Sequence, residues 1–264
     1  MGADAASATP PPLSHRTRGV LAVAGLAVIG GLWDLVTRLE LLPRFVLPAP
    51  AAVGRAFFDF SGPLLDAARV TLVEILLGFG LAVGIGLGLA LCITYSRVLS
   101  AVLYPPIIVL QAVPKLAIAP LLIIWFGFGL ASKVVVAFLI AFFPVVIQTT
   151  VGLRTVEPEL HDLARIHRAS WFRRFTRIDF PHALPYFFAA LKVAITLAVT
   201  GAIVGEFVAS DAGLGFLLQS AVGQHLTALA YATVAVIALV SMALFGSVVA
   251  LQRVVMPWAS SRSG

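Results

Sequence analysis

The chain has 264 residues, of which 60% are hydrophobic and 11% are charged, and its net charge is +6. Soluble domains are about half apolar and about a quarter charged, so this composition excludes an ordinary water-facing surface and also excludes intrinsic disorder. The single cysteine, Cys92, excludes an intramolecular disulfide framework and a cysteine-based zinc cluster.

Six apolar stretches are long enough to cross a bilayer, and they predict an all-α integral membrane protein. A helix needs about 20 mostly apolar residues to cross a hydrocarbon core of about 30 Å. The stretches cover approximately residues 19–36, 70–94, 98–126, 134–153, 183–209 and 228–251. The third stretch is predicted to be kinked or broken by its prolines, which are Pro105, Pro106, Pro114 and Pro120.

The segments outside these stretches predict how the chain is divided. Residues 1–18 are small, polar and proline-rich before they become basic, which indicates a disordered cytoplasmic N-terminus. The first apolar run begins like a signal peptide, but it continues through Trp33 without a small-residue cleavage pattern, which favours an uncleaved span over 19–36. An external linker over 37–69, a five-helix membrane domain over 65–251 and a cytoplasmic tail over 252–264 are expected to follow.

The basic residues predict that both termini lie in the cytoplasm. With six spans in that orientation, 12 of the 18 Lys and Arg residues fall on the cytoplasmic side. The outer side then holds the other six, Arg38, Arg44, Arg55, Arg69, Lys115 and Lys133. This asymmetry agrees with the positive-inside rule, so the basic charge indicates membrane topology instead of nucleic-acid binding.

The segment 154–182, between the fourth and fifth predicted spans, is the most hydrophilic part of the chain. Pro158 suits the first turn of a helix, and Ser170 can cap a second, shorter helix. The second helix carries aromatic residues on one side and basic residues elsewhere: Trp171, Phe172 and Phe175, with Arg173 and Arg174. The residues alone leave two interpretations open, a basic loop on anionic lipid headgroups or a helical pair that docks into a groove on another protein.

This segment resembles the cytoplasmic loop of ABC-importer permeases, whose pattern is a Glu-Ala-Ala start, a later glycine and a Leu-Pro end. The corresponding residues are Asp162-Leu163-Ala164 at the start, Arg168 at the glycine position and Phe180-Pro181 at the end. Asp162 and Arg168 depart from the family residues. The resemblance favours the docking interpretation, in which the aromatic residues make apolar contacts with an ATPase and Arg173 and Arg174 supplement them electrostatically.

Other segments resemble the nitrate/sulfonate/taurine branch of the same family, and the resemblance covers about residues 45–251. In chain order they are Phe45-Val46-Leu47-Pro48-Ala49-Pro50, the run 113–120 followed by Trp125-Phe126-Gly127-Phe128-Gly129, and Glu206 followed by Gly213-Leu214-Gly215. The resemblance implies a type I importer (MetI-like) bundle of six helices in a bacterial inner membrane. It also implies a separate ABC ATPase, an external or periplasmic solute-binding protein and a second permease copy, most simply as a homodimer.

The sequence predicts no catalytic site, no cofactor and no metal site. None of the three lysines follows a glycine, so the Gly-Lys pair of a Walker A loop is missing and ATP hydrolysis is expected in a separate subunit. The histidines form no short metal-binding cluster, and a solvated or interface role is favoured for His161 and His167. The nucleophile elbow Gly-x-Ser-x-Gly does not occur.

Two charged residues near the spans are candidates for the substrate pathway, Lys115 and Glu206. Lys115 lies between Pro114 and Pro120, where a broken span exposes backbone and a cation could attract an anionic substrate. The alternatives are a loop lysine or a pair between Lys115 and a carboxylate such as that of Glu206. A third charged residue, Glu74, is expected to pair with Arg69 or to cap a helix.

Three glycines of the second stretch, Gly80, Gly84 and Gly88, recur every four residues and therefore share one helix face. Small residues at this spacing let helices approach closely in membranes. The pattern predicts tight packing of this face, either within the bundle or against a second copy of the chain.

Together these features predict the permease subunit of an ATP-driven importer. The expected solute is a small anion such as a sulfonate, taurine, nitrate or an aromatic carboxylate. A stand-alone secondary transporter or channel is the alternative, although it usually carries an internal repeat, and no convincing repeat is present. A non-transporting scaffold that recruits a partner through its loop is a third possibility.

Overall fold

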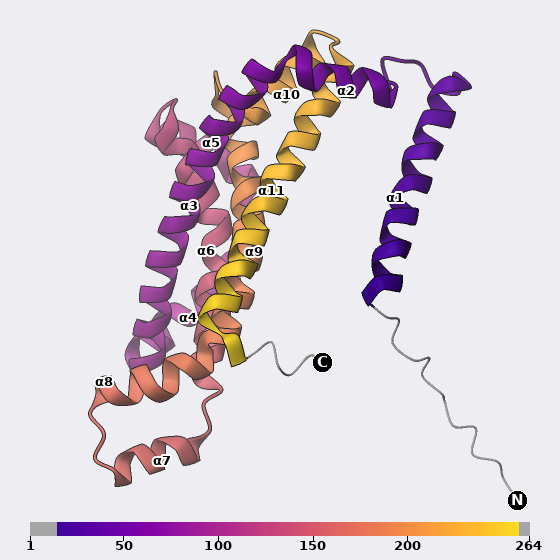
Figure 1. Ribbon diagram of the computed structural model, residues 1–264. Coiled ribbons are helices and arrows are strands. Elements are labelled where there is room, and N and C mark those ends of the chain that lie inside the picture. Colours follow the sequence, from indigo (N-terminus) through magenta and orange to yellow (C-terminus); the bar gives the residue numbers. More distant parts are fainter. Residues whose placement is uncertain (1–14, 259–264) are drawn as a thin grey trace, which may run out of the picture.

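The computed structural model describes residues 15–258, and every regular element in that range is helical, which confirms the predicted all-α class. Residues 1–14 and 259–264, which hold most of the predicted N-terminal segment and part of the predicted tail, lie outside the described range. The elements are α1 (His15–Arg38), α2 (Pro50–Asp59), α3 (Ser61–Tyr95), α4 (Arg97–Gln111), α5 (Lys115–Phe126), α6 (Leu130–Arg154), α7 (Pro158–Ile166), α8 (Trp171–Arg174), the π-helix η1 (Phe175–Asp179), α9 (Phe180–Ala209), α10 (Leu214–Gly223) and α11 (Thr227–Val255) (Figure 1).

Among the described residues, four helical runs are long and apolar enough to cross a membrane. They are α3, α6, the run Trp171–Val208 and α11. The bent pair α4 and α5 makes a fifth if it counts as one span. The first predicted span coincides with α1, a helix of 24 residues that begins at His15, inside the segment predicted to be disordered.

The third predicted span is broken, and the structure locates the break between Gln111 and Lys115. The axes of α4 and α5 differ in direction by 106°. Pro114 precedes α5 with a non-helical ψ of 90°. Proline also lacks an N–H and disfavours helical geometry in the residue before it, so the helix does not continue through Val113 and Pro114. Pro105 and Pro106 lie inside α4 without ending it.

The centre of the bundle is α6, which packs closely against both α3 and α9. Ala137 of α6 lies between two glycines, one from each neighbour. A Cβ atom added to Gly78 of α3 would lie 2.6 Å from the Ala137 Cβ, and one added to Gly201 of α9 would lie 2.6 Å from the Ala137 Cα. The two glycines are therefore required for the close approach of the three helices.

The predicted glycine face of α3 does not pack against any other part of residues 15–258. A Cβ atom added to Gly80, Gly84 or Gly88 would meet nothing within 4 Å, whereas one added to Gly86 would lie 2.9 Å from Val145 Cγ1. The glycines that pack lie on the face of α3 that carries Gly78 and Gly86. Because α3 is apolar on all sides, its hydrophobic pattern does not reveal which face is buried.

The two ends of the bundle differ in what they carry. Figure 1 shows α7, α8 and the C-terminal end of α11 at one end, and α2 and α10 at the other. Helix α1 stands to one side and is tied to the second end through Trp33, whose Nε1 donates to the Pro48 carbonyl at 3.0 Å. The Trp33 and Tyr231 rings also lie 6.1 Å apart.

Candidate functional site

The loop 154–182, called the charged loop below, begins with the amphipathic helix α7. Ala164 is buried at 6% exposure, while Leu163 and Ile166 are exposed at 51% and 77%. Asp162 forms an exposed ion pair with Arg165 at 2.9 Å on the same helix. The outer face of α7 therefore combines apolar side chains with opposite charges, as docking helices do.

Arg168 takes the backbone conformation that the family pattern assigns to glycine. Its φ of 46° lies in the left-handed region. The N–H of Ala169 donates to the Ala164 carbonyl at 2.9 Å, and the N–H of Arg168 donates to the Arg165 carbonyl at 3.0 Å. This pair of bonds is a Schellman motif with arginine in place of the usual glycine. The turn between the two loop helices is thus retained.

The three aromatic residues predicted to dock on a partner point in different directions. Phe172 is exposed at 68%. The rings of Trp171 and Phe175 stack at 5.6 Å with an interplanar angle of 4°, and both meet Tyr95 at the end of α3 edge-on. Phe175 therefore belongs to the bundle, and Trp171, although 56% exposed, rests on it. The three aromatic side chains therefore do not share one face, since Phe172 is exposed while Trp171 and Phe175 contact Tyr95, and the docking role of these residues stays a prediction.

The helix is not interrupted at the end of the charged loop. Ser170 caps α8 by accepting from the Arg173 N–H at 3.4 Å, as predicted, but α8 then continues through η1 into α9. Pro181 lies directly after η1 at the start of α9, and the run stays helical through it. The helix α9 begins at Phe180, where the sequence analysis expects the loop to end, although one helical run extends without a break from Trp171 to Val208.

A buried carboxylate that the sequence analysis did not identify lies at the junction of loop and bundle. Asp179 is 2% exposed, and its carboxylate accepts from the Tyr95 hydroxyl at 2.6 Å. His161 Nε2 lies 3.0 Å from Asp179 Oδ1, and Arg174 Nε lies 3.4 Å from Oδ2. His161 thus contacts the bundle, and no spacing in the sequence indicates this contact.

Lys115 and Glu206, the candidate pathway residues, are not brought together. Lys115 Nζ donates to the Gln111 carbonyl at 2.7 Å and lies 4.7 Å above the centre of the Phe143 ring. It therefore satisfies a backbone group at the break between α4 and α5. The pair with Glu206, one of the two alternatives to substrate contact, is not formed, and substrate contact by Lys115 stays a prediction.

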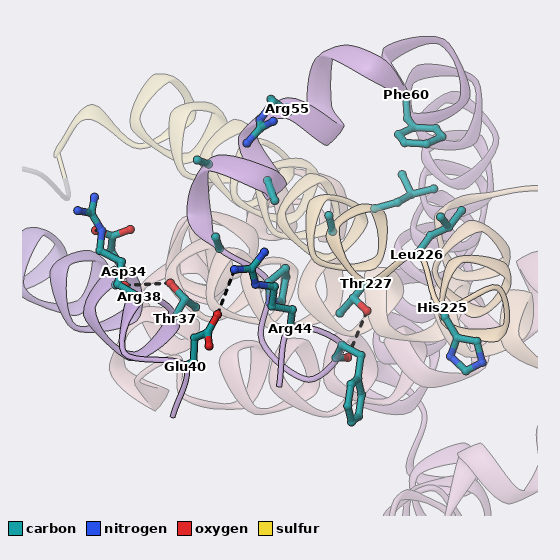
Figure 2. A pocket seen from close by; sticks show the side chains of 17 residues that line it. Asp34, Thr37, Arg38, Glu40, Arg44, Arg55, Phe60, His225, Leu226 and Thr227 are labelled. Atoms are coloured by element: carbon teal, nitrogen blue, oxygen red, sulfur yellow. Dashed lines mark hydrogen bonds and ion pairs between the residues drawn. The ribbon is translucent and has the colours of Figure 1, made fainter. Parts of the chain in front are cut away.

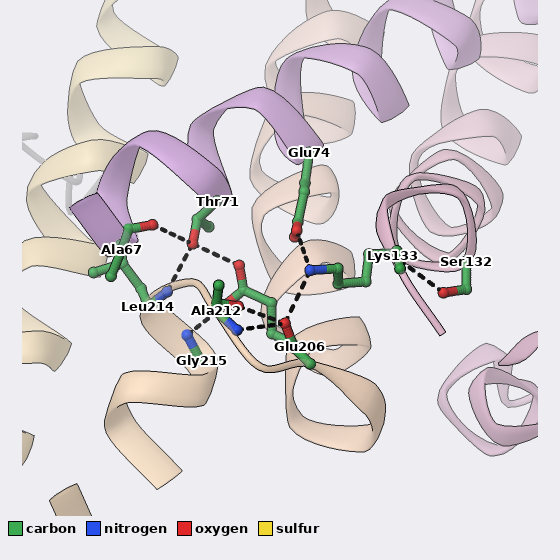
Figure 3. A network of polar contacts seen from close by, with 11 residues as sticks. Ala67, Thr71, Glu74, Ser132, Lys133, Glu206, Ala212, Leu214 and Gly215 are labelled. Atoms are coloured by element: carbon green, nitrogen blue, oxygen red, sulfur yellow. Dashed lines mark hydrogen bonds and ion pairs between the residues drawn. The ribbon is translucent and has the colours of Figure 1, made fainter. Parts of the chain in front are cut away.

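A buried ionic network lies at the end of the bundle that carries α10 (Figure 3). Lys133 of α6 pairs with Glu74 of α3 at 2.6 Å, and these side chains are 6% and 0% exposed. Lys133 also donates to the Ser210 hydroxyl at 2.9 Å. The expected pair of Glu74 with Arg69 does not form, since Arg69 pairs with Asp66 instead. Lys133, which the sequence analysis counts among the basic residues on the outer side of the membrane, is buried in the bundle.

Glu206 holds the start of α10 in this network. Its carboxylate accepts from the Thr71 hydroxyl at 2.6 Å and from the Gly215 N–H, and Thr71 accepts from the Leu214 N–H at 2.8 Å. A carboxylate at a helix N-terminus satisfies free N–H groups there. A Cβ atom at Gly213, whose φ is 105°, would collide with the Glu206 carboxylate. The motif Glu206 with Gly213-Leu214-Gly215 is thus one packing unit.

Comparison with known proteins explains why these features occur together. Residues 80–261 match the family described as "Binding-protein-dependent transport system inner membrane component". The chain belongs to this family of ABC transporter permeases. The permease is 40% identical over 231 residues to a riboflavin transport system permease protein, RibX, of Chloroflexus aurantiacus, covering 87% of this chain and 86% of RibX. It is 31% identical over 255 residues to the taurine transport system permease protein TauC of Escherichia coli, covering 94% and 92%.

The permease also shares its fold with a solved ABC transporter. An inward-facing MetNI methionine transporter structure aligns with a TM-score of 0.58 at 18% identity, covering 73% of this chain and 97% of that one. The predicted MetI-type fold is confirmed. Further relatives are named for aliphatic sulfonates and nitrate, which confirms the branch predicted from the sequence.

A cavity beside α1 shares no lining residue with the ionic network (Figure 2). It measures about 770 Å³ and is lined by the end of α1, the following linker, α2 and the start of α11. Its arginines are partly neutralised, because Arg38 pairs with Asp34 at 2.7 Å and Arg44 with Glu40 at 3.2 Å. This cavity is open to one flank of the permease, so it does not identify a solute path through α3, α6 and α9.

Proposed function

We propose that this permease is the membrane subunit of an ATP-driven importer and that its charged loop docks on a separate ABC ATPase. The observation that carries the proposal is the pair of loop helices outside the bundle, which exposes Leu163, Ile166 and Phe172. Large apolar side chains exposed together on a hydrophilic element favour a protein partner. An external solute-binding protein and a second permease copy complete the proposed transporter, as the family resemblance implies.

The proposed orientation places the charged loop and both termini in the cytoplasm. The distribution of Lys and Arg supports it, and so does the position of the C-terminal end of α11 at the same end of the bundle as α7. The ionic network around Glu206 then lies toward the external side, where a binding protein would deliver the solute.

The proposed solute is a small organic or inorganic anion, with taurine as the test compound. A second candidate is a flavin, which the greater identity to RibX favours over the identity to TauC. The two candidates are separated by reconstituting the permease with its ATPase and binding protein and measuring uptake of taurine and of riboflavin.

The docking role is tested with Phe172→Ala in the reconstituted transporter. Hot-spot side chains contribute at least about 1 kcal/mol to an interface, so the affinity of the ATPase for the permease should fall about fivefold or more. ATPase stimulation by loaded binding protein should fall with it. Thermal unfolding of the isolated permease should not change, because Phe172 is exposed.

Two matched variants control this experiment. Phe128→Ala removes another exposed phenylalanine, 84% exposed between α5 and α6, and should leave ATPase affinity unchanged. Phe175→Ala should lower the thermal stability of the permease, because Phe175 packs on Tyr95. Undiminished ATPase binding by Phe172→Ala would refute the docking assignment. Uptake without any ATPase would instead support a secondary transporter.

A further inference from the structure

We propose that Asp179 is a positioning residue that locks the charged loop to α3 and α9, so that a displacement of α7 moves both spans as one unit. This inference rests on the proposed function, because it specifies how a docked loop acts on the bundle. It concerns the contacts of Asp179 with His161 of α7 and with Tyr95 of α3.

The carboxylate of Asp179 joins three separate elements. Its Oδ1 contacts His161 of α7 at 3.0 Å, and its Oδ2 accepts from the hydroxyl of Tyr95, the last residue of α3, at 2.6 Å. Asp179 itself immediately precedes α9. A contact between residues 161 and 179 closes the loop on itself, and the contact with Tyr95 fixes the closed loop to a different span.

The π-helix η1 sets the position of Asp179. A π turn inserts an extra residue into a helix, which rotates the side chains before it relative to those after it. Asp179 is the last residue of η1 and is buried, whereas Arg177 two residues earlier is exposed. Phe175 and Asp179, the first and last residues of η1, both contact Tyr95, so the π turn is compatible with both contacts.

The burial of Asp179 makes its contacts with the loop and with α3 strong and selective. A buried carboxylate is stable only when donors or cations surround it, so each partner of Asp179 is held in place. Arg174 Nε supplies a nearby positive charge at 3.4 Å from Oδ2. The Tyr95 ring also contacts Trp171 and Phe175, with centroids at 5.5 Å and 6.3 Å. Polar and aromatic contacts therefore fix the same end of α3 to the loop, and packed elements of this kind move as rigid bodies.

The decisive variant is Asp179→Asn in the complete transporter in proteoliposomes, with taurine or riboflavin as solute, whichever the wild type transports. The amide keeps the shape but loses the charge. ATPase association should stay at the wild-type level, while solute transported per ATP should fall about five- to tenfold, the size of a modest coupling free energy. In the isolated permease, amide hydrogen exchange of α7 should become faster, because its tie to the bundle is weakened.

Three further variants separate positioning from folding. His161→Gln keeps a side-chain N–H donor and should retain more transport per ATP than His161→Ala. Tyr95→Phe removes one hydroxyl and keeps the aromatic contacts, so it should show a partial loss. Arg177→Gln, on the same turn but exposed, is the matched control and should behave as wild type. If Asp179→Asn does not fold, the His161 and Tyr95 variants decide the question.

Several results would overturn the proposal. Wild-type transport per ATP in Asp179→Asn would do so, and so would equal behaviour of His161→Gln and His161→Ala. Loss of ATPase association in Asp179→Asn would show that the residue shapes the docking surface and does not position the spans. A wild-type permease that never responds to an ATPase refutes the proposed function, and the exchange of α7 then still decides whether Asp179 holds the loop.

Discussion

Arg168 stands where the family pattern has a glycine, but the backbone at this position keeps the left-handed conformation that favours glycine. The left-handed conformation is less favourable than right-handed helical geometry by about 1–2 kcal/mol for a non-glycine residue. The Schellman bonds of Ala169 and Arg168 hold the turn nevertheless. The local strain is thus tolerated because the turn joins two helices that are fixed elsewhere.

Replacing Arg168 with glycine should stabilise this turn. We expect a gain of about 1 kcal/mol, because the relief of strain at φ 46° is partly offset by the greater freedom of glycine in the unfolded chain. Thermal unfolding of the permease and hydrogen exchange of α7 measure the gain. Arg168→Lys keeps the Cβ atom and the positive charge and should leave both unchanged, so an equal effect of the two substitutions would show that the loss of the guanidinium group, and not the relief of backbone strain, is the cause.

At the scale of elements, Lys133 connects helices that are far apart in the sequence. It extends from α6 to the buried Glu74 on α3 and to the half-buried Ser210 after α9. Removing one member of a buried pair leaves an uncompensated charge, which is more destabilising than removing both.

The substitution Lys133→Met should therefore lower the free energy of unfolding by about 3–5 kcal/mol. The double variant Lys133→Met with Glu74→Gln should recover most of that loss. Lys115→Met, which removes a lysine bonded to a backbone carbonyl at the α4–α5 break, serves as the control and should have a much smaller effect. Denaturant or thermal unfolding in detergent gives the comparison. A double variant no more stable than Lys133→Met would argue against the ionic pair as the cause.

The elements show which features of the fold can be predicted from the sequence. Hydrophobic length predicted the spans, and prolines predicted the break before α5, because both signals are local. The partner of Glu74, the buried side of Phe175 and the glycines that pack on α6 were missed. Each depends on which face of an apolar helix turns inward, and a helix that is apolar on every side carries no such signal. Asp179 was missed because its partners lie on α3 and α7, and the π turn that points it inward leaves no mark in the residue pattern.

At the scale of the whole molecule, the exposed glycine face of α3 is available to a second copy of the permease. Gly84→Leu should leave the monomer folded, since a side chain there meets nothing within 4 Å. If this face packs against the second copy, the variant should convert the dimer into a monomer, which native mass spectrometry in detergent would detect. Gly86→Leu should instead lower thermal stability, because Val145 already occupies the space. A dimer that persists in Gly84→Leu would place the permease contact elsewhere.

The ionic network also has a consequence for how the chain enters the membrane during synthesis. Glu74 is made first, its partner Lys133 follows on α6, and Glu206 comes last with the start of α10. An unpaired charge in a spanning segment costs a few kcal/mol, so α3 enters the bilayer less readily before α6 than after it. The spans of this permease are therefore expected to leave the insertion machinery as a group. The synthesis of α6 is the step that makes α3 stable in the lipid.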